Sequence, residues 1–215
     1  MADCKLILGN KTYSSWSLRG WLVVRLADLA CEEVVIPLRK PGTRAEILKY
    51  SPAGKVPTLV VDGEPLWDSL ATAEYLAESF PGKGLWPADP AARRLARCVS
   101  AEMHAGFTAL RGALPMDLSS HYPDHPLSAE VQADVDRIQQ IWRDCRGRFG
   151  AGGDFLFGRV SIADVFYAPV VTRFRSYDVK LDGVAEAYCT AVTSWPLMQE
   201  WAAAAAEETE VIVFD

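Results

Sequence analysis

Two backbone features between residues 51 and 78 could together bind a small acidic peptide. Val56 is held extended ahead of Pro57, so its N–H and C=O groups form an edge on which a peptide can lie as an added strand. Asp68 and Ser69 begin a predicted helix, where free N–H groups, the helix dipole and a serine hydroxyl attract a carboxylate. A short peptide that carries a carboxylate would satisfy both features.

The elements that position these residues alternate between strands and helices. Short apolar runs predict strands at Lys5–Gly9, Val34–Ile36, Thr58–Val61 and Pro65–Trp67. Apolar spacing predicts helices at Ser17–Ala30, Arg44–Tyr50 and from the Asp68-Ser69 cap to Phe80. The dipeptide Asp62-Gly63 joins the last two strands as a hairpin. This order is typical of a thioredoxin-like α/β domain, which we place at residues 1–80.

The chain after residue 80 indicates a linker followed by helices. Residues 81–90 contain three prolines and two glycines, which end the preceding helix. Strand signals are then absent until the C-terminal tail, and helices are predicted at 91 to about 114, 131–145, 161–174, 184–193 and 196–206. Ser161 and Asp164 have the spacing of a capping box, so we assign them a structural role. We expect an all-α domain over residues 91–215.

The composition argues against several kinds of partner. With 215 residues and 50% apolar content, the chain can form two compact domains. A net charge of -6 and a pI near 5.2 argue against nucleic acid and anionic membrane surfaces, because both require a basic face. The apolar run Leu6–Leu8 is too short for a signal peptide or a membrane-spanning helix, so we predict a cytoplasmic protein.

The cysteines and histidines indicate neither a disulfide framework nor a metal site. The cysteines are odd in number and scattered, so we predict reduced, mostly buried thiols at Cys4, Cys31, Cys98, Cys145 and Cys189. His121 and His125 have the spacing of a helical zinc pair, but two prolines make this segment a loop and no third ligand is evident. We expect no bound metal.

The loop G-K-V-P-T-L-V-x-D-G, followed by D-S-x-A-x-x-x-Y-L, resembles the glutathione site of the glutathione S-transferase family. The resemblance implies a cis Pro57, with Val56 pairing with the cysteinyl backbone of glutathione. It implies that Asp68 and Ser69 hold the γ-glutamyl end and that Lys55 approaches the glycine carboxylate or the cysteinyl region. It further implies the fold of that family, glutathione as co-substrate and a two-fold homodimer.

The loop between the first strand and the first helix most resembles the zeta class, in a bacterial-type member. The zeta pattern Ser-Ser-Cys-x-x-Arg maps onto Ser14, Ser15, Trp16 and Arg19, with tryptophan in place of cysteine. A hydroxyl that donates to the bound sulfur would lower the thiol pKa, and Ser14, Ser15 and Tyr13 are the candidates, in that order. Because Trp16 cannot form a mixed disulfide, redox chemistry and the zeta-class isomerase activity are less strongly implied.

The second substrate is expected where the first helix after the linker passes this loop. Met103, His104, Phe107 and Met116 provide a soft apolar surface with one titratable group, and Trp16 is the candidate for the opposite wall. Among these we select Trp16, His104 and Phe107 as substrate residues.

The sequence therefore predicts a glutathione S-transferase in which a serine hydroxyl stabilises the glutathione thiolate for attack on a small apolar electrophile. Two alternatives stay open. One is a glutathione-dependent cis-trans isomerase of the maleylacetoacetate type, which returns glutathione unchanged. The other is a non-catalytic module that binds glutathione or another ligand.

Overall fold

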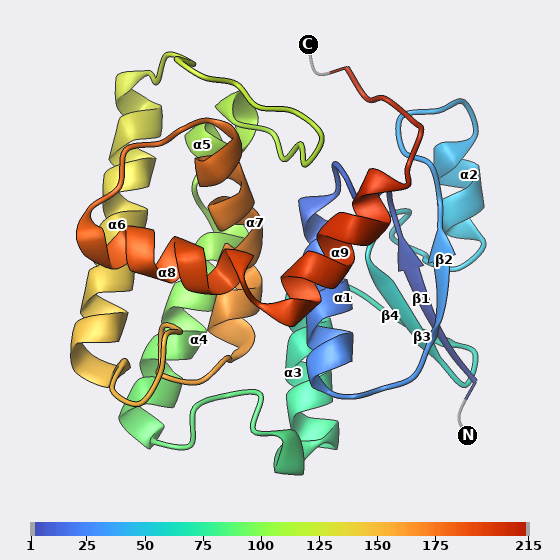
Figure 1. Ribbon diagram of the computed structural model, residues 1–215. Helices are drawn as coiled ribbons and strands as arrows, with labels where there is room; N and C mark the ends of the chain where they lie inside the picture. Colours follow the sequence, from blue (N-terminus) through green and yellow to red (C-terminus); the bar gives the residue numbers. More distant parts are fainter. Residues whose placement is uncertain (1–2, 214–215) are drawn as a thin grey trace. The chain divides into compact units, whose positions relative to one another are not determined.

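The computed structural model describes residues 3–213 and groups them into two compact units (Figure 1). The first, the sheet unit, contains the residues up to Lys83 together with those from Glu200 onward. The second, the helical unit, contains Gly84–Gln199. The residues from Glu200 onward, which the sequence analysis includes in the helical domain of residues 91–215, are grouped here with the sheet.

The described part of the sheet unit contains a four-stranded mixed sheet in the order β2-β1-β3-β4. Its strands are β1 (Cys4–Leu8), β2 (Glu32–Val35), β3 (Thr58–Val61) and β4 (Glu64–Leu66). β2 is parallel to the central β1, whereas β3 is antiparallel to β1 and to β4. Its helical segments are α1 (Ser15–Leu26), α2 (Thr43–Leu48), α3 (Ser69–Ser79) and the short 3-10 helix η1 (Pro81–Lys83). The predicted thioredoxin-like order is confirmed.

The central strand β1 is buried on both faces, which explains its apolar run. Ile7 packs with Ile36 and Ile47 on the side of α2. Helices α1 and α3 lie on the other side of the sheet (Figure 1). Leu6 and Leu8 alternate with Ile7 along the strand, so their side chains face α1. The sheet unit thus has a core on each face of one short sheet.

The helical unit is built around aromatic side chains from three of its helices. Its helices are α4 (Pro90–Ala105), α5 (Thr108–Ala113), α6 (Ala129–Phe149), α7 (Ile162–Ser176), α8 (Gly183–Thr193) and the first residues of α9 (Pro196–Ala206). The Trp142 ring lies 5.8 Å from that of Tyr167, 5.5 Å from Phe174 and 4.7 Å from Tyr188. Beyond α9 the described tail, which ends at Val213, contains no strand.

The single long helix predicted over residues 91–114 is wrong, because the structure has two helices there. Helix α4 ends at Ala105, and Phe107 adopts a left-handed backbone with φ of 58°. A Cβ on Gly106 would lie 2.8 Å from the carbonyl oxygen of Glu102, so glycine lets the chain leave the helix at this point. The apolar spacing continues through both helices, so periodicity alone did not reveal the break.

The predicted capping box at the start of α7 is confirmed. Asp164 Oδ2 accepts hydrogen bonds from the N–H of Ser161 (2.8 Å) and from its hydroxyl (3.0 Å). Asp164 Oδ1 accepts from the N–H of Leu156 and the hydroxyl of Tyr188. Burial raises the pKa of Asp164 to about 6, although these four donors act in the opposite direction. Asp164 therefore holds the start of α7 in place.

The prediction that all cysteines are reduced is wrong, because Cys4 and Cys31 form a disulfide with a Cα–Cα distance of 4.6 Å. Lys5 of β1 pairs with Glu32 of β2, so the two cysteines occupy the preceding positions of adjacent parallel strands. Their separation of 27 residues hides this relation in the sequence. Of the other cysteines, Cys98 is exposed. Cys145 and Cys189 are buried, and burial raises the pKa of each of these two thiols to about 12.

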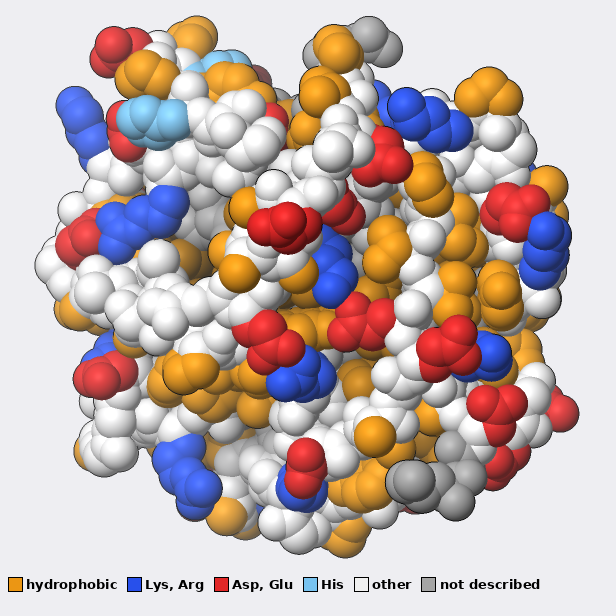
Figure 2. All heavy atoms as spheres, turned by 45° about the vertical axis from the view of Figure 1, so that its right-hand side comes forward, with side chains coloured by type: hydrophobic (Ala, Val, Ile, Leu, Met, Phe, Trp, Pro, Cys, Tyr) orange, Lys and Arg blue, Asp and Glu red, His pale blue; other side chains and the backbone are white. Residues whose placement is uncertain are grey.

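The structure can be compared with the expectations about nucleic acid, membranes and metal ions. On the face drawn in Figure 2, acidic and basic side chains are interspersed and no extended basic patch is visible. Among residues 3–213, no helix is both long and apolar enough to span a bilayer. The same residues contain no group of three or more His, Cys, Asp or Glu side chains that could hold a metal ion. His121 instead lies 2.9 Å from Asp178, and His125 packs edge-on against Tyr177.

Candidate functional site

Three loops meet at one end of the sheet because of the strand register. Ile7, next to the end of β1, pairs with Thr58 at the start of β3. Leu59 pairs with Leu66 at the end of β4. The loop after β1, the loop before β3 and the segment after β4 therefore lie side by side. They carry most of the site residues predicted from the sequence: Ser14, Ser15, Lys55, Val56, Pro57, Asp68 and Ser69.

The loop before β3 is held against α1. The peptide bond between Val56 and Pro57 is cis, which confirms the expectation from the family resemblance. Pro57 is buried, and a Cβ added to Gly20 of α1 would lie only 2.6 Å from its ring atoms. Within the described chain, the N–H and C=O of Val56 have no hydrogen-bond partner. The backbone edge that the sequence predicted at Val56 is therefore open, and Gly20 allows the close approach that positions it.

The start of α3 combines a cap with an unpartnered hydroxyl. Asp68 is the N-cap, and its Oδ1 accepts from the N–H groups of Leu70 (2.9 Å) and Ala71 (3.1 Å). Ser69, the first helical residue, is only 2% exposed, and its Oγ has no hydrogen-bond partner among residues 3–213. A buried hydroxyl without a partner is costly, so its retention at a helix N-terminus fits a site that an anionic ligand completes.

Lys55 is exposed at the turn before Val56, and its carbonyl oxygen accepts from the Thr58 hydroxyl at 3.1 Å. Its ammonium group forms no ion pair with any residue that the structure describes. A free cation at this end of the sheet adds positive potential beside the helix N-terminus of α3.

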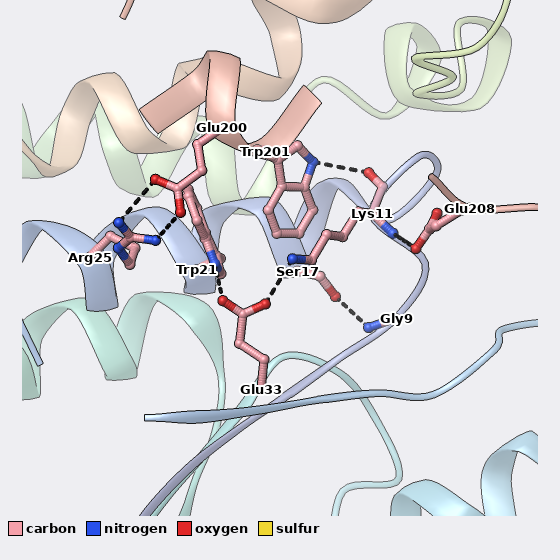
Figure 3. Close-up of polar contacts among 9 residues, drawn as sticks. All are labelled: Gly9, Lys11, Ser17, Trp21, Arg25, Glu33, Glu200, Trp201 and Glu208. Atoms are coloured by element: carbon pink, nitrogen blue, oxygen red, sulfur yellow. Dashed lines mark hydrogen bonds and ion pairs between the residues drawn. The ribbon is translucent and has the colours of Figure 1, made fainter. Parts of the chain in front are cut away.

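The Ser14 hydroxyl lies at the N-terminus of α1. It accepts from the N–H of Ser17 at 3.3 Å and donates to the Ser17 hydroxyl at 2.8 Å. Ser17 Oγ in turn accepts from the N–H of Gly9 at 2.8 Å (Figure 3). Ser15 is the first helical residue and, like Ser14, is buried, whereas Tyr13 is half-buried. Ser14 therefore has a hydroxyl fixed in place whose proton can be redirected to a ligand.

The loop that carries Ser14 is anchored by the C-terminal segment of the sheet unit (Figure 3). The Glu208 carboxylate accepts from the backbone N–H groups of Lys11 (2.6 Å) and Thr12 (2.9 Å). Trp201 Nε1 donates to the Lys11 carbonyl oxygen at 3.0 Å, and the Thr12 hydroxyl donates to the Ala205 carbonyl oxygen at 3.1 Å. Sequence reasoning missed these residues, because about 190 residues separate them from the loop they hold.

The side chain of Lys11 extends the same network to β2. Its Nζ lies 2.7 Å from Glu33 Oε2, while Glu33 Oε1 accepts from Trp21 Nε1 at 2.6 Å (Figure 3). The ammonium group also lies 5.3 Å from the centre of the Trp201 ring. The loop before α1 is therefore tied to an edge strand and to the end of the chain.

The predicted substrate residues belong to both units. Trp16, on α1 beside the serines, stacks on the guanidinium of Arg19 with a distance of 4.5 Å to the ring centre. His104, near the end of α4, lies 6.0 Å from the Phe166 ring within the helical unit. Phe107 is buried in that unit, as are the two methionines that the sequence placed beside it. His104 is thus the more accessible of the two candidates there.

Comparison with known proteins gives a consistent result. Residues 13–79 match the family model of the glutathione S-transferase N-terminal domain, and residues 128–204 match that of the C-terminal domain. The maleylacetoacetate isomerase of Rhizobium meliloti is 33% identical over 189 residues, which cover 78% of this chain and 81% of that protein. The probable maleylacetoacetate isomerase of Caenorhabditis elegans is 26% identical over 185 residues, or 84% of each chain.

Solved structures share the fold. A Burkholderia glutathione transferase homologue, solved with bound glutathione, aligns with a TM-score of 0.73 at 21% identity over 97% of this chain and 100% of its own. Glutathione transferase Omega 3C from Trametes versicolor aligns with a TM-score of 0.70 at 18% identity over 99% of this chain and 92% of its own.

Replacing Gly20 by Ala is expected to destabilise the protein by about 1–3 kcal/mol, because the new methyl group would overlap the Pro57 ring. Urea unfolding followed by circular dichroism measures this change. The matched control is Gly147→Ala on α6, where a Cβ meets open space, and it should stabilise the helix by about 0.5–1 kcal/mol. Equal effects of the two substitutions would show that α1 does not depend on close contact with Pro57.

Proposed function

Since this chain belongs to the glutathione S-transferase family, we propose that it activates the glutathione thiol with the Ser14 hydroxyl and directs the thiolate at a small apolar electrophile. The chain is thus an enzyme with glutathione as its co-substrate, and the non-catalytic alternative is not retained. The observation that carries the proposed binding mode is the buried, unpartnered Ser69 hydroxyl at the start of α3.

We propose that the γ-glutamyl end of glutathione binds at α3. The Ser69 hydroxyl and the first N–H groups of the helix donate to its carboxylate, and the Asp68 carboxylate attracts its ammonium group. The cysteinyl backbone pairs with the open N–H and C=O of Val56, as an added strand would. Lys55 draws in the glycine carboxylate. In this arrangement the thiol points toward the loop after β1.

Thiol activation is then assigned to Ser14 rather than Ser15. Ser14 is the N-cap of α1, so its hydroxyl lies where the helix dipole is most positive. It can transfer its donated hydrogen bond from Ser17 Oγ to the sulfur while still accepting from the Ser17 N–H. The thiol loses its proton to water, and Ser14 keeps its own. The thiolate forms a bond to the electrophilic carbon as the leaving group departs.

The electrophile is assigned to apolar and aromatic groups. Trp16 is the proposed contact on the sheet unit, beside the serines. On the helical unit we propose His104, with Phe107 as a packed support beneath it, because Phe107 is buried. From the family we further propose a cytoplasmic location and a two-fold homodimer.

A second candidate function is cis-trans isomerisation, because several curated relatives are named maleylacetoacetate isomerase. The thiolate would add to the substrate and later leave, so glutathione would emerge unchanged. Trp16, which replaces the zeta-class cysteine, distinguishes this chain from that pattern.

Measuring free glutathione during turnover separates the two reactions, since a nitro-substituted aryl halide consumes one glutathione per product and maleylacetoacetate consumes none. Turnover of maleylacetoacetate without activity on any aryl halide would favour the isomerase.

The Ser69→Ala variant is expected to bind glutathione about ten-fold more weakly, because it loses one hydrogen bond to the γ-glutamyl carboxylate. Its stability should not fall, since the hydroxyl has no partner in the free protein. Isothermal titration calorimetry and urea unfolding measure the two effects. Ser100→Ala, which removes another buried and unpartnered hydroxyl on α4, is the matched control and should leave the affinity unchanged. Unchanged affinity in Ser69→Ala would refute the proposed carboxylate contact.

The Ser14→Ala variant is expected to lose about 10²-fold in kcat/KM, because the thiolate loses its hydroxyl donor. The apparent pKa of the pH–rate profile should rise toward that of free glutathione, an effect that simple loss of a helix cap would not produce. Ser14→Thr keeps the hydroxyl and should restore most of the activity. If Ser15→Ala shows the loss and Ser14→Ala does not, the activating group is Ser15.

A further inference from the structure

A cavity of about 310 Å³ lies beside the C-terminal half of α1, and Cys31 forms part of its wall. Trp21, Val24 and Ala30 line it as well. The cavity lies toward the end of α1 that is remote from Ser14, so it is separate from the proposed glutathione site. Its size falls within the range of cavities that bind small molecules.

The two cysteines of the disulfide differ in exposure. Cys4 is only 6% exposed and is not part of the cavity wall. Cys31 is partly exposed and lines the cavity. A reagent that enters the cavity therefore meets Cys31 rather than Cys4, and attack on the Cys31 sulfur releases Cys4 as the leaving thiolate.

The charged side chains around the cavity are all paired. Each charged side chain of the wall has a partner of opposite charge in the sheet unit: Arg25 with Glu200, Asp28 with Lys83, and Glu33 with Lys11. The wall and its partners are thus neutral as a set. A zwitterionic or acidic thiol of low molecular weight can approach without crossing a field of like charge.

We propose that this cavity is a thiol–disulfide exchange site, at which a thiol of low molecular weight such as glutathione opens the Cys4–Cys31 bond at Cys31. The attacking thiolate forms a mixed disulfide with Cys31, and Cys4 leaves with the electron pair of the broken bond and takes a proton from water. A second thiolate attacks the glutathione sulfur of the mixed disulfide. The products are oxidised glutathione and two protein thiols, and the two electrons come from the two glutathione molecules.

Opening the Cys4–Cys31 disulfide would remove a covalent link between the edge strand β2 and its neighbour β1. The disulfide lies directly before β2. This strand is also held by its pairing with β1, by the packing of Val34 against the core and by polar contacts of Glu32 with Lys5 and of Glu33 with Lys11 and Trp21. Glu33 of β2 therefore connects this strand to the loop that carries Ser14, through its ion pair with Lys11. Opening the disulfide should increase amide hydrogen exchange in Glu32–Val35, while the strands of the β3–β4 hairpin stay protected.

The first test compares Cys4→Ala with Cys31→Ala, each of which leaves one former disulfide partner as a free thiol. Both are treated with oxidised glutathione, and adducts are located by peptide mass spectrometry. Cys31 in Cys4→Ala should acquire glutathione at least about ten-fold faster than Cys4 in Cys31→Ala, because only Cys31 lines the cavity. The exposed Cys98 provides a reference rate in the same samples. Equal rates, or no adduct on Cys31, would overturn the proposal.

The second test uses the intact disulfide. Ala30→Trp places a large side chain in the cavity and should slow reduction of the bond by glutathione several-fold, as measured by trapping the released thiols. Val184→Trp, an exposed position in the helical unit, controls for added bulk and should reduce at the wild-type rate. Equal rates in the two variants, or a wild-type bond that millimolar glutathione does not open, would contradict the proposal. Neither test depends on transferase activity. Failure of the exchange proposal can therefore be told apart from failure of the proposed function.

Discussion

The antiparallel pairing of β1 with β3 is the interaction on which the proposed glutathione site depends. The pairing of Ile7 with Thr58 places Pro57 beside the end of β1, and the β3–β4 hairpin then brings Asp68 and Ser69 to the same end of the sheet. A shift of one residue would turn the side chains of β3 to the opposite faces of the sheet. Such a shift would also move Pro57 away from α1, so one register sets the positions of all three loops.

The surroundings of the site divide into rigid and adaptable parts. The core side chains of β1 and the contact between Gly20 and Pro57 leave the loop before β3 little freedom. The loop after β1 is held mainly by hydrogen bonds from Trp201 and Glu208 and by the ion pair between Lys11 and Glu33. The proposed thiol activation therefore depends on a loop that distant parts of the chain hold in place. One of these contacts comes from Glu33 of β2, the strand that follows the disulfide.

Local signals in the sequence predicted much of this structure. The hairpin dipeptide, the Asp68 cap and the capping box of α7 each involve only a few neighbouring residues, so they can be predicted from the sequence alone. The family resemblance supplied the cis bond at Pro57. The disulfide and the anchors of the Ser14 loop were missed because they join residues that only folding brings together. The break at Phe107 was missed because apolar spacing continues across it.

A crystal structure of this chain with bound glutathione would show directly which hydroxyl binds the sulfur. We expect the sulfur to lie within hydrogen-bonding distance of Ser14 Oγ. We also expect the γ-glutamyl carboxylate to lie about 2.7 Å from Ser69 Oγ and the cysteinyl backbone to pair with Val56. A sulfur that instead lies against the hydroxyl of Ser15 or Tyr13, or a carboxylate that leaves Ser69 unpartnered, would refute the proposed binding mode.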